Sequence, residues 1–515
     1  MPPSGLEPWL DGVHDAEGMR AADRWAIEEQ GVSSLELMEA AGRAVARAAA
    51  EVAGDGPARV VCGKGNNGGD GLVAARALAE TGFEAEALLL WPPDELSEDS
   101  KANLERLEGE ARHLGADEVA SALEGSGVVV DAIFGTGFSD APRAPADAAV
   151  EAINACGARV VAADIASGVD ASTGEVAGVA VEADVTVSFH AAKLGHWIAP
   201  GKRHGGELQV APIGIPIGAP ALTRAGLIAP AVLEQPPCRG DGSTKFSSGQ
   251  VVVVGGSRGL TGAVCMAATA AIRAGAGYAT VAVPADLEPI FEVKLTEVMS
   301  RGFSGVEGRL GSGDADAILE AAAGAAAVVL GPGMGRDDDS FSLARELAAG
   351  VEAPLLIDAD ALNALAGRLD EVASRAHPTV LTPHAGELGR LLERDSAAIN
   401  EHRLAAARDA AAASGAVIVL KGDDTLVVRG DRVAVNPVSA PALATAGTGD
   451  VLSGTIGALL ARGTEPYTAA CAGVLAHARA GREAADRVGA AESVIATDVI
   501  EALPAGLRAQ ATDSI

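Results

Sequence analysis

Short apolar runs alternate with alanine-rich stretches along the whole chain. Strands that are buried on both faces of a parallel sheet read as continuous runs of Val, Ile and Leu. Such runs occupy residues 60–62, 128–134, 159–165, 185–189, 250–254, 278–283, 325–330, 354–357 and 416–420. The pattern predicts an α/β architecture in both halves, with open sheets that carry helices on each face.

Two segments depart from this rhythm. Residues 425–428 and 433–435 flank the turn sequence Arg429-Gly430-Asp431-Arg432, which predicts a hairpin at a sheet edge. Residues 451–460 are almost entirely apolar, which predicts a buried helix.

Chain-breaking residues mark a boundary near the middle of the chain. Proline and glycine are concentrated at residues 213–220 and 235–242. A chain of 515 residues is also too long for one ordinary core. We therefore predict one domain over residues 1–225, a linker over 226–240 and a second domain over 241–515.

The charge balance is strongly acidic. The formal net charge is -31, and the cations comprise 7 lysines and 32 arginines. Binding to a nucleic-acid backbone is excluded, because no basic footprint is available. The composition leaves two interpretations open: a generic acidic surface, or adaptation to a salt-rich cytoplasm in which charge repulsion is screened.

Composition also predicts a soluble cytoplasmic protein. Hydrophobic residues make up 48% of the chain without forming a run of eighteen, so no membrane span is expected. The N-terminus lacks an apolar signal core, and no secretion is implied. The five cysteines show no metal-binding spacing and are expected to be buried thiols in a reducing compartment.

Two glycine-rich loops carry the candidate chemistry. Residues 63–71 and 446–450 each follow strand-like sequence and open a helix, a position where backbone N–H groups favour phosphate. The alternative for each is a tight turn whose aspartate caps a helix.

Segments 131–137 and 164–170 end two further strands of the first half. The carboxyl ends of parallel strands share one crevice, so these loops are expected to converge with residues 63–71. Oxygens of Asn67, Asp131 and Ser167 would suit a hard cation there.

Residues 10–220 resemble the NAD(P)H-hydrate epimerases. The resemblance rests on KGNNGGDG at 64–71, DAIFGTG at 131–137, the segment 164–170, FHAAKLG at 189–195 and LMEAAG at 37–42. It implies a Rossmann-like fold and a potassium ion held through Asn67, Asp131 and Ser167. It also implies substrate contacts from Asn66, Asn67, Gly68, Gly69, Asp70, Gly135, Thr136, Gly137, Phe138, Ser139, Asp140, Ala141 and Asp164. Ala166 stands where that family usually has proline.

Interconversion of R and S hydrates requires C6 of the reduced nicotinamide ring to be opened and reclosed. Asp164 is the leading candidate for the proton carrier, because it lies at the carboxyl end of a strand. The alternative role for Asp164 is to orient a loop or the ribose.

The second half places Asp450 beside glycine amides at the start of the predicted buried helix. There it is suited to take a proton from a hydroxyl nucleophile while the amides hold phosphate charge. Residues 240–505 resemble the ADP-dependent NAD(P)H-hydrate dehydratases, whose fold is ribokinase-like. Seven motifs agree in order, at 245–249, 255–263, 331–335, 358–363, 381–387, 420–422 and 446–450. Ala385 replaces a proline that is common in that family.

The resemblance implies roles for individual residues of the second half. Ala263, Gly333, His384 and Asp450 would line the hydrate site, with Asp450 as base. Lys421, Gly422, Asp423, Asp424, Thr425 and Gly449 would contact the adenine nucleotide. The C6 hydroxyl would attack the β-phosphate of ADP, release AMP and later lose phosphate, with Mg²⁺ as cofactor and Glu387 as a possible support.

The sequence predicts a fused repair enzyme in which the epimerase supplies the dehydratase, and we expect a homo-oligomer. One alternative for the second half is an ATP-dependent kinase of a small hydroxyl substrate, which Gly-x-Gly-Asp alone would allow. An alternative for the first half is a binding domain without catalysis. His477 is interpreted as part of a packed helix.

Overall fold

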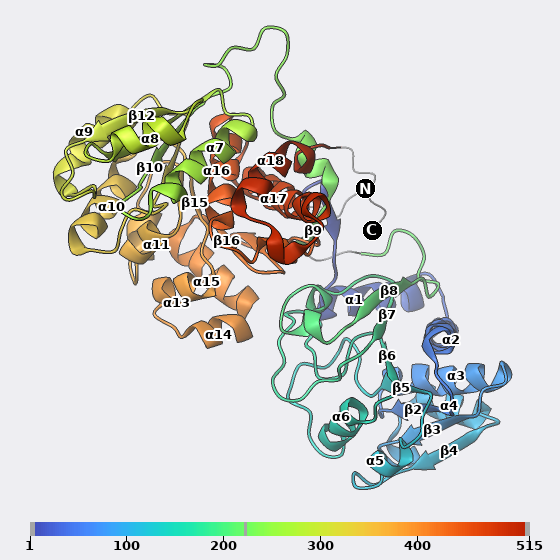
Figure 1. The fold of residues 1–515 in the computed structure, drawn as a ribbon. Coiled ribbons are helices and arrows are strands. Elements are labelled where there is room, and N and C mark those ends of the chain that lie inside the picture. Colours follow the sequence, from blue (N-terminus) through green and yellow to red (C-terminus); the bar gives the residue numbers. More distant parts are fainter. Residues whose placement is uncertain (1–5, 221–223, 510–515) are drawn as a thin grey trace. The chain divides into compact units, whose positions relative to one another are not determined.

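The computed structural model describes residues 6–220 and 224–509, which form two compact units (Figure 1). The first unit holds Gly12–Ala225. The second unit holds the chain from Gly226 onward together with the N-terminal segment Glu7–Asp11. The α/β class expected from the apolar runs is confirmed in both units.

The first unit is built on a parallel sheet of seven strands. In spatial order these are β4 (Glu110–His113), β3 (Ala85–Leu89), β2 (Ala58–Cys62), β5 (Val128–Ala132), β6 (Arg159–Ala163), β7 (Val185–Phe189) and β8 (Glu207–Ala211). The order reverses between β2 and β5. In open α/β sheets, ligands bind outside the carboxyl ends of the strands at such a switch point.

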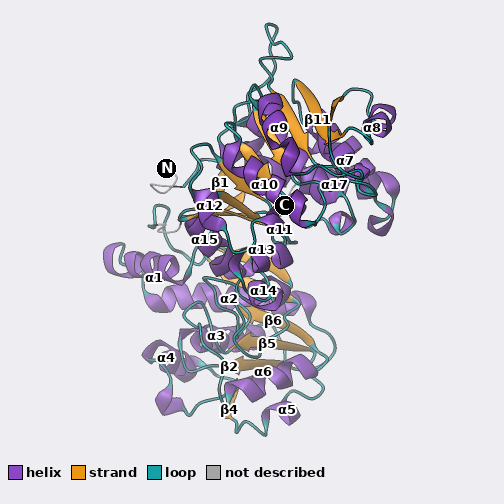
Figure 2. Ribbon diagram, turned by 90° about the vertical axis from the view of Figure 1, so that its left-hand side faces the viewer, coloured by secondary structure: helices purple, strands orange, loops and turns teal. Residues whose placement is uncertain are grey.

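Helices cover both faces of this sheet (Figure 2). Alternate strand residues face opposite sides: Val60 packs with α2 (Ser34–Val52) and α3 (Asn66–Glu80), whereas Val61 packs with α6 (Ala146–Ala155). The unit also contains α1 (Ala16–Arg24), a π-helical turn (Trp25–Glu29), α4 (Glu98–Arg106), α5 (Val119–Ala122) and three short 3-10 helices (Pro93–Glu95, Leu194–His196 and Gly201–Arg203).

The second unit is built on an eleven-stranded sheet. In spatial order these strands are β1 (Leu10–Gly12), β9 (Ala225–Ile228), β18 (Arg432–Val435), β17 (Leu426–Arg429), β16 (Val417–Leu420), β15 (Thr379–Leu381), β14 (Leu355–Ile357), β13 (Ala327–Leu330), β10 (Gln250–Val254), β11 (Tyr278–Pro284) and β12 (Met299–Phe303). Strands β16 to β12 pair in parallel, and β16, β17 and β18 pair antiparallel.

The helices of the second unit also lie on both sides of its sheet (Figure 2). They are α7 (Thr261–Arg273), α8 (Glu288–Lys294), α9 (Ala315–Ala322), α10 (Asp338–Gly350), α11 (Asp360–Ala364), α12 (Leu369–Ala373), α13 (Ala385–Leu392), α14 (Ser396–Glu401), α15 (Arg403–Ser414), α16 (Thr448–Ala461), α17 (Pro466–Val488) and α18 (Ala496–Gly506), with 3-10 helices at Pro230–Glu234, Ser312–Asp314, Pro441–Leu443 and Ala491–Ser493. All residues of α16 from Val451 to Ala461 are buried, which confirms the predicted buried helix.

The hairpin over 426–435 forms as predicted, but its position at a sheet edge is wrong. Strand β9 pairs with β18, and β1 lies beyond β9. The sequence could not reveal this, because β1 comes from the opposite end of the chain and is only three residues long. The predicted linker, residues 226–240, contains regular structure in its first half. Residues 225–228 form β9, and residues 230–234 form a 3-10 helix.

Two smaller expectations can be compared with the structure. All five cysteines are free thiols, but only Cys62 and Cys471 are buried, and Cys238 is exposed. Within residues 6–220 and 224–509, no helix is long and apolar enough to cross a membrane.

Candidate active sites

The first unit contains a cavity of about 570 Å³ at the carboxyl ends of its central strands. The loops after β2, β5 and β6 meet there, as the sequence predicted. Of the predicted substrate contacts, Asn66, Asn67, Asp70, Gly135, Thr136, Gly137, Phe138 and Asp164 line the cavity. The rings of Phe134 and Phe138 stack with centroids 4.0 Å apart and form an apolar wall.

Asp164 is the most heavily bonded side chain of this cavity. It follows β6 with a left-handed backbone (φ 70°), and its carboxylate accepts hydrogen bonds from Thr136 N at 3.0 Å and Phe189 N at 3.3 Å. It also forms an ion pair with Lys193, whose side chain is fully buried. Burial alone would raise the pKa of Asp164, but Lys193 and Thr136 hold it below its usual value. Asp164 is therefore an ionised carboxylate inside the protein.

Two further carboxyl groups that line the same cavity have raised pKa values. Burial, then repulsion from Asp164 and Asp23, raises the pKa of Asp70 well above its usual value. Burial, then repulsion from Asp164, raises the pKa of Asp23 to about 6. The cavity thus combines an ionised carboxylate (Asp164), a protonated acid (Asp70) and an acid that titrates just below neutral pH (Asp23), an arrangement suited to acid–base chemistry.

Of the three predicted cation ligands, Asn67 lines the cavity, whereas Asp131 and Ser167 contact each other outside its lining. Asp131 is fully buried and accepts hydrogen bonds from Ser167 N at 2.8 Å and Ser167 Oγ at 2.6 Å. Burial raises the pKa of Asp131 to about 6, and no cationic side chain counteracts this rise. Asn67 Nδ2 is buried and has no partner among the described residues. A buried carboxylate beside amide and hydroxyl oxygens fits a hard cation.

Five predicted substrate contacts lie outside the cavity lining. Gly68 and Gly69 are packing residues of α3: a Cβ atom would lie 1.9 Å from Gly63 O at position 68 and 2.5 Å from Met38 Sδ at position 69. The other three predicted contacts that do not line the cavity are Ser139, Asp140 and Ala141.

The second unit contains a cavity of about 310 Å³ beside the N-terminus of α16. Of the predicted nucleotide contacts, Lys421, Gly422, Asp423, Thr425 and Gly449 line it. Asp424 does not line it and instead forms a buried ion pair with Arg403, with Nε and Oδ2 2.8 Å apart. The opposite wall is apolar and is formed by Val438, Ala440, Pro441, Leu443, Ala444, Leu452, Val474 and Ala478.

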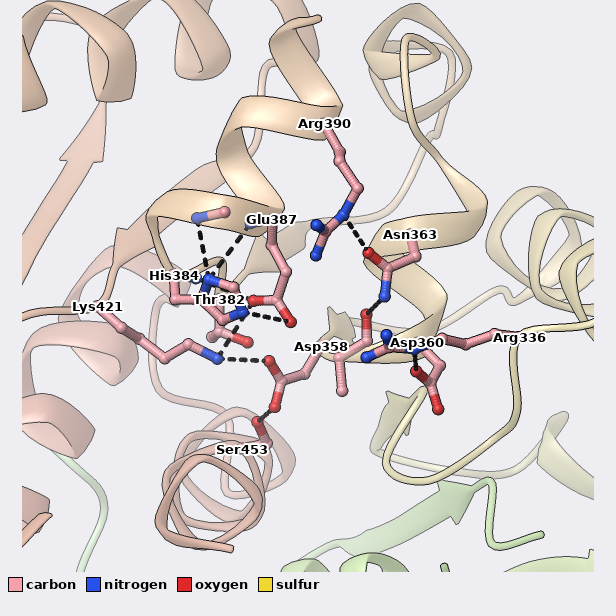
Figure 3. A network of polar contacts seen from close by, with 12 residues as sticks. Arg336, Asp358, Asp360, Asn363, Thr382, His384, Glu387, Arg390, Lys421 and Ser453 are labelled. Atoms are coloured by element: carbon pink, nitrogen blue, oxygen red, sulfur yellow. Dashed lines mark hydrogen bonds and ion pairs between the residues drawn. The ribbon is translucent and has the colours of Figure 1, made fainter. Parts of the chain in front are cut away.

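A polar network lies at one end of this cavity, where Lys421 reaches towards α16 (Figure 3). Lys421 Nζ contacts Asp358 Oδ1 at 2.9 Å and Glu387 Oε2 at 3.6 Å. Ser453 Oγ, from α16, donates to Asp358 Oδ2 at 2.7 Å. Asp358 therefore links the strand-end lysine to the helix that carries Asp450.

Asp450 lies in the first turn of α16, and Gly447 at the start of this helix has the left-handed conformation (φ 93°) that glycine permits. Burial, then repulsion from Asp358, raises the pKa of Asp450 to about 7. Burial opposes the charge on Lys421, but Asp358 and Glu387 raise the pKa of Lys421 above its usual value. The network thus contains a permanent cation and a carboxyl group that titrates near neutral pH.

The predicted hydrate residues come from different elements of the same unit: Ala263 from α7, Asp450 from α16, His384 from the N-cap of α13 and Gly333 from the loop after β13. Gly333 lies next to Ala263, because a Cβ atom built at position 333 would be 3.1 Å from Ala263 Cβ. His384 caps α13, where its Nδ1 accepts from Gly386 N at 3.0 Å, while Glu387 Oε2 accepts from His384 N at 2.9 Å. Nδ1 acts as an acceptor, so the single proton of the neutral His384 ring lies on Nε2. The exposed edge of the ring is therefore a hydrogen-bond donor.

Sequence reasoning missed several residues of these sites. Lys193 was recognised only as part of the motif at 189–195. A lysine near the end of a strand, in a chain with few lysines, itself indicates a functional site. Asp23 comes from helix α1 and carried no local signal. Asp358 and Ser453 were assigned no role. His477 lines the 310 Å³ cavity rather than serving only in helix packing.

Both halves of the chain match known family models. Residues 251–505 match the model described as NAD(P)H-hydrate dehydratase, and residues 34–195 match the YjeF-related protein N-terminus. The bifunctional NAD(P)H-hydrate repair enzyme Nnr of Moorella thermoacetica is 40% identical over 512 residues, which cover 96% of each chain. Its counterpart in Salinibacter ruber is 38% identical and covers 98% of this chain and 97% of its own.

Solved structures resemble the second unit. The ADP/ATP-dependent NAD(P)H-hydrate dehydratase of Bacillus subtilis, co-crystallised with ATP and Mg²⁺, is 26% identical with a TM-score of 0.46. The match covers 53% of this chain and 94% of that chain.

Proposed function

The chain belongs to the family of bifunctional NAD(P)H-hydrate repair enzymes, and on this basis we propose which of its residues carry out the repair. The protein repairs hydrated NADH and NADPH. Its N-terminal unit interconverts the R and S hydrates, and its C-terminal unit dehydrates the S form with an adenine nucleotide.

In the C-terminal unit, Asp450 acts as the base. The observation that carries this proposal is the pKa of about 7 for a carboxyl group at the N-terminus of α16, beside Lys421. A carboxylate with that pKa accepts the proton of the C6 hydroxyl as this oxygen attacks the β-phosphate of ADP. The α16 amides and the Lys421 ammonium stabilise the phosphate charge, and AMP leaves. Phosphate is then expelled from C6, which restores the nicotinamide double bond.

The nucleotide is bound in the 310 Å³ cavity. Gly422, Asp423, Thr425 and Gly449 contact it, and the apolar wall accommodates its nucleoside part. Mg²⁺ neutralises charge on the transferred phosphate when it is bound. Glu387 suits a supporting role, because its carboxylate is buried in the same network, with Oε2 3.6 Å from Lys421 Nζ and Oε1 3.5 Å from the neutral His384 ring. Mg²⁺ is usually held by one or two carboxylates together with phosphate oxygens.

In the N-terminal unit, Asp164 is the proposed proton carrier, held ionised and in place by Lys193. Asp70 supplies a protonated carboxyl group in the same cavity, and Asp23 supplies one that titrates at about pH 6. This division allows one group to take a proton from the substrate while another donates one, as opening and reclosure of C6 require.

Asn67, Asp131 and Ser167 are proposed to hold K⁺. The support is the buried Asp131 carboxylate, which is stabilised by hydrogen bonds from Ser167 but by no cationic side chain. A bound monovalent cation would compensate this charge and bring Asn67 Oδ1 into the same coordination sphere.

The test is recovery of absorbance at 340 nm from an R/S mixture of hydrated NADH with ADP, Mg²⁺ and K⁺. We expect complete recovery by the parent chain. Asp450→Ala should give none but should still convert the R hydrate to the S hydrate, as followed by chromatography. Recovery of only the S fraction by the parent would refute Asp164-dependent epimerisation.

The kinase alternative for the second half predicts a phosphorylated vitamin precursor as product and no recovery at 340 nm. The full-length similarity to repair enzymes favours dehydration instead, because the N-terminal unit has a substrate to supply only if the C-terminal unit consumes a hydrate.

A further inference from the structure

His477 lines the 310 Å³ cavity, and its Nε2 has no hydrogen-bond partner among the described residues. It lies on α17 in register with Val474 and Ala478, and all three line the cavity. The side chain is buried, with 7% of its surface exposed, and its Nε2 has no hydrogen-bond partner in the described chain. A buried polar atom is normally satisfied, so this nitrogen calls for a partner that enters the cavity.

The protonation state of the ring determines which partner fits. Burial lowers the pKa of His477 to about 4, and the charge of Lys421 acts in the same direction, so the ring is neutral at pH 7. A hydrogen bond with the Thr448 backbone raises the pKa, as a bond that the ring donates does. The donating nitrogen carries the single ring proton, and Nε2 is left as an acceptor.

An acceptor in this position cannot contact the phosphates. At neutral pH the phosphate oxygens of a nucleoside diphosphate are themselves acceptors, and Lys421 and the α16 amides serve them. The donors of an adenine nucleotide are the ribose hydroxyls and the 6-amino group of the base. Both belong to the nucleoside, which is also the part that the apolar wall beside Val474 can cover.

We propose that His477 Nε2 accepts a hydrogen bond from the nucleoside of the bound diphosphate and is a specificity-determining residue of the C-terminal site. The proposal rests on the function assigned to that cavity above. It gives α17 a recognition role that is separate from the proton chemistry of Asp450.

The test compares ADP, 2′,3′-dideoxy-ADP, which lacks both ribose hydroxyls, and inosine diphosphate, which lacks the 6-amino group, by titration calorimetry with the full chain. We expect the wild type to bind ADP about tenfold more tightly than whichever analogue lacks the recognised donor. His477→Leu should lose about tenfold in ADP affinity and bind that analogue unchanged. His477→Gln, which can place an amide oxygen near the Nε2 position, should recover part of the discrimination.

Val474→Ala is the matched control, because it lies one turn away on the same wall and offers no polar atom. It should weaken all three nucleotides by a similar factor. Equal weakening of all three by His477→Leu would overturn the proposal and leave a packing role. Equal binding of all three by the wild type would also overturn it. Failure of the wild type to bind ADP at all would instead refute the proposed nucleotide site.

A second measurement does not depend on a variant that folds. The imidazole ¹⁵N resonance of His477 Nε2 in the wild type should shift on addition of ADP and stay in place on addition of inorganic pyrophosphate. A shift with pyrophosphate, or none with ADP, would contradict a bond to the nucleoside.

Discussion

At the scale of single residues, the proposed role of Asp450 as the base makes the C-terminal reaction depend on its protonation. A base works as its carboxylate, and burial beside Asp358 raises the pKa of Asp450 to about 7. The rate of dehydration should therefore rise from pH 5.5, reach half of its plateau at about pH 7 and level off above about pH 8. Asp450→Asn should lower kcat by roughly 10²–10⁴-fold and remove this rise. Rates of NADH recovery from the S hydrate at saturating ADP measure both effects; a flat profile for the parent would contradict the assignment.

Lys193 is predicted to stabilise the N-terminal unit through Asp164. Replacing one partner of a buried ion pair leaves an uncompensated charge, which typically costs about 3–5 kcal/mol. Lys193→Met should reduce the free energy of unfolding of this unit by about that amount, because both side chains are buried. Urea unfolding followed by hydrogen–deuterium exchange in the N-terminal unit measures the effect without depending on epimerase activity.

The control for Lys193→Met is the double variant with Asp164→Asn. It removes the buried charge and should recover most of the lost stability, although not the activity. If Lys193→Met alone were as stable as the parent, the prediction would be wrong. That result would show that water or another cation compensates the charge of Asp164.

At the scale of elements, helix α16 depends on its close packing against α7. A Cβ atom at Gly454 would lie 1.9 Å from Ala267 O, a backbone atom that cannot move without displacing α7. Gly454→Ala should therefore destabilise the C-terminal unit by about 1–3 kcal/mol and shift Asp450, one turn away. Gly324→Ala, where no atom lies within 4 Å, should be nearly neutral. Thermal unfolding and the dehydratase assay distinguish the two variants.

Elements whose signals are local could be predicted from the sequence. The loops after β2, β5 and β6 were expected to converge, because parallel strands end at a common edge, and they line one cavity. The hairpin of β17 and β18 also formed where its turn residues indicated.

Contacts between distant segments could not be predicted in this way. Asp23 enters the N-terminal cavity from α1, and Ser453 reaches Asp358 across 95 residues of sequence. Strand β3 was missed because its sequence, AEALL, includes a glutamate and suits a helix as well as a strand. Such placements depend on tertiary packing, which no window of the chain contains.

At the scale of the whole molecule, the N-terminal segment is part of the C-terminal unit. Trp9 is buried, with 3% of its surface exposed, and its ring lies 6.0 Å from that of Tyr467 on α17. Glu7 Oε1 accepts from Arg432 Nη1 at 2.8 Å. Trp9→Ala should therefore lower the stability of the C-terminal unit by about 3–5 kcal/mol, although the residue lies at the other end of the sequence.

The two activities of the full chain report this effect separately. Heating Trp9→Ala should inactivate the dehydratase at a lower temperature than in the parent and leave the epimerase curve in place, whereas Trp9→Phe should keep most of the packing. Loss of epimerase activity alone would contradict the placement of this segment.

The net charge of -31 leads to a prediction for the whole surface. Self-repulsion of a strongly acidic chain destabilises its compact state, and salt at 1 M reduces the screening length to about 3 Å. Exposed ion pairs such as Arg258–Asp286 are also screened, but each contributes little, so the release of repulsion should dominate. We therefore expect the melting temperature of both units to rise between 0.1 and about 2 M KCl. A parallel series in sucrose separates charge screening from general solute exclusion, because sucrose stabilises folded proteins without screening charge.

A melting temperature that falls with KCl would contradict adaptation to a salt-rich cytoplasm and favour the interpretation of a generic acidic surface.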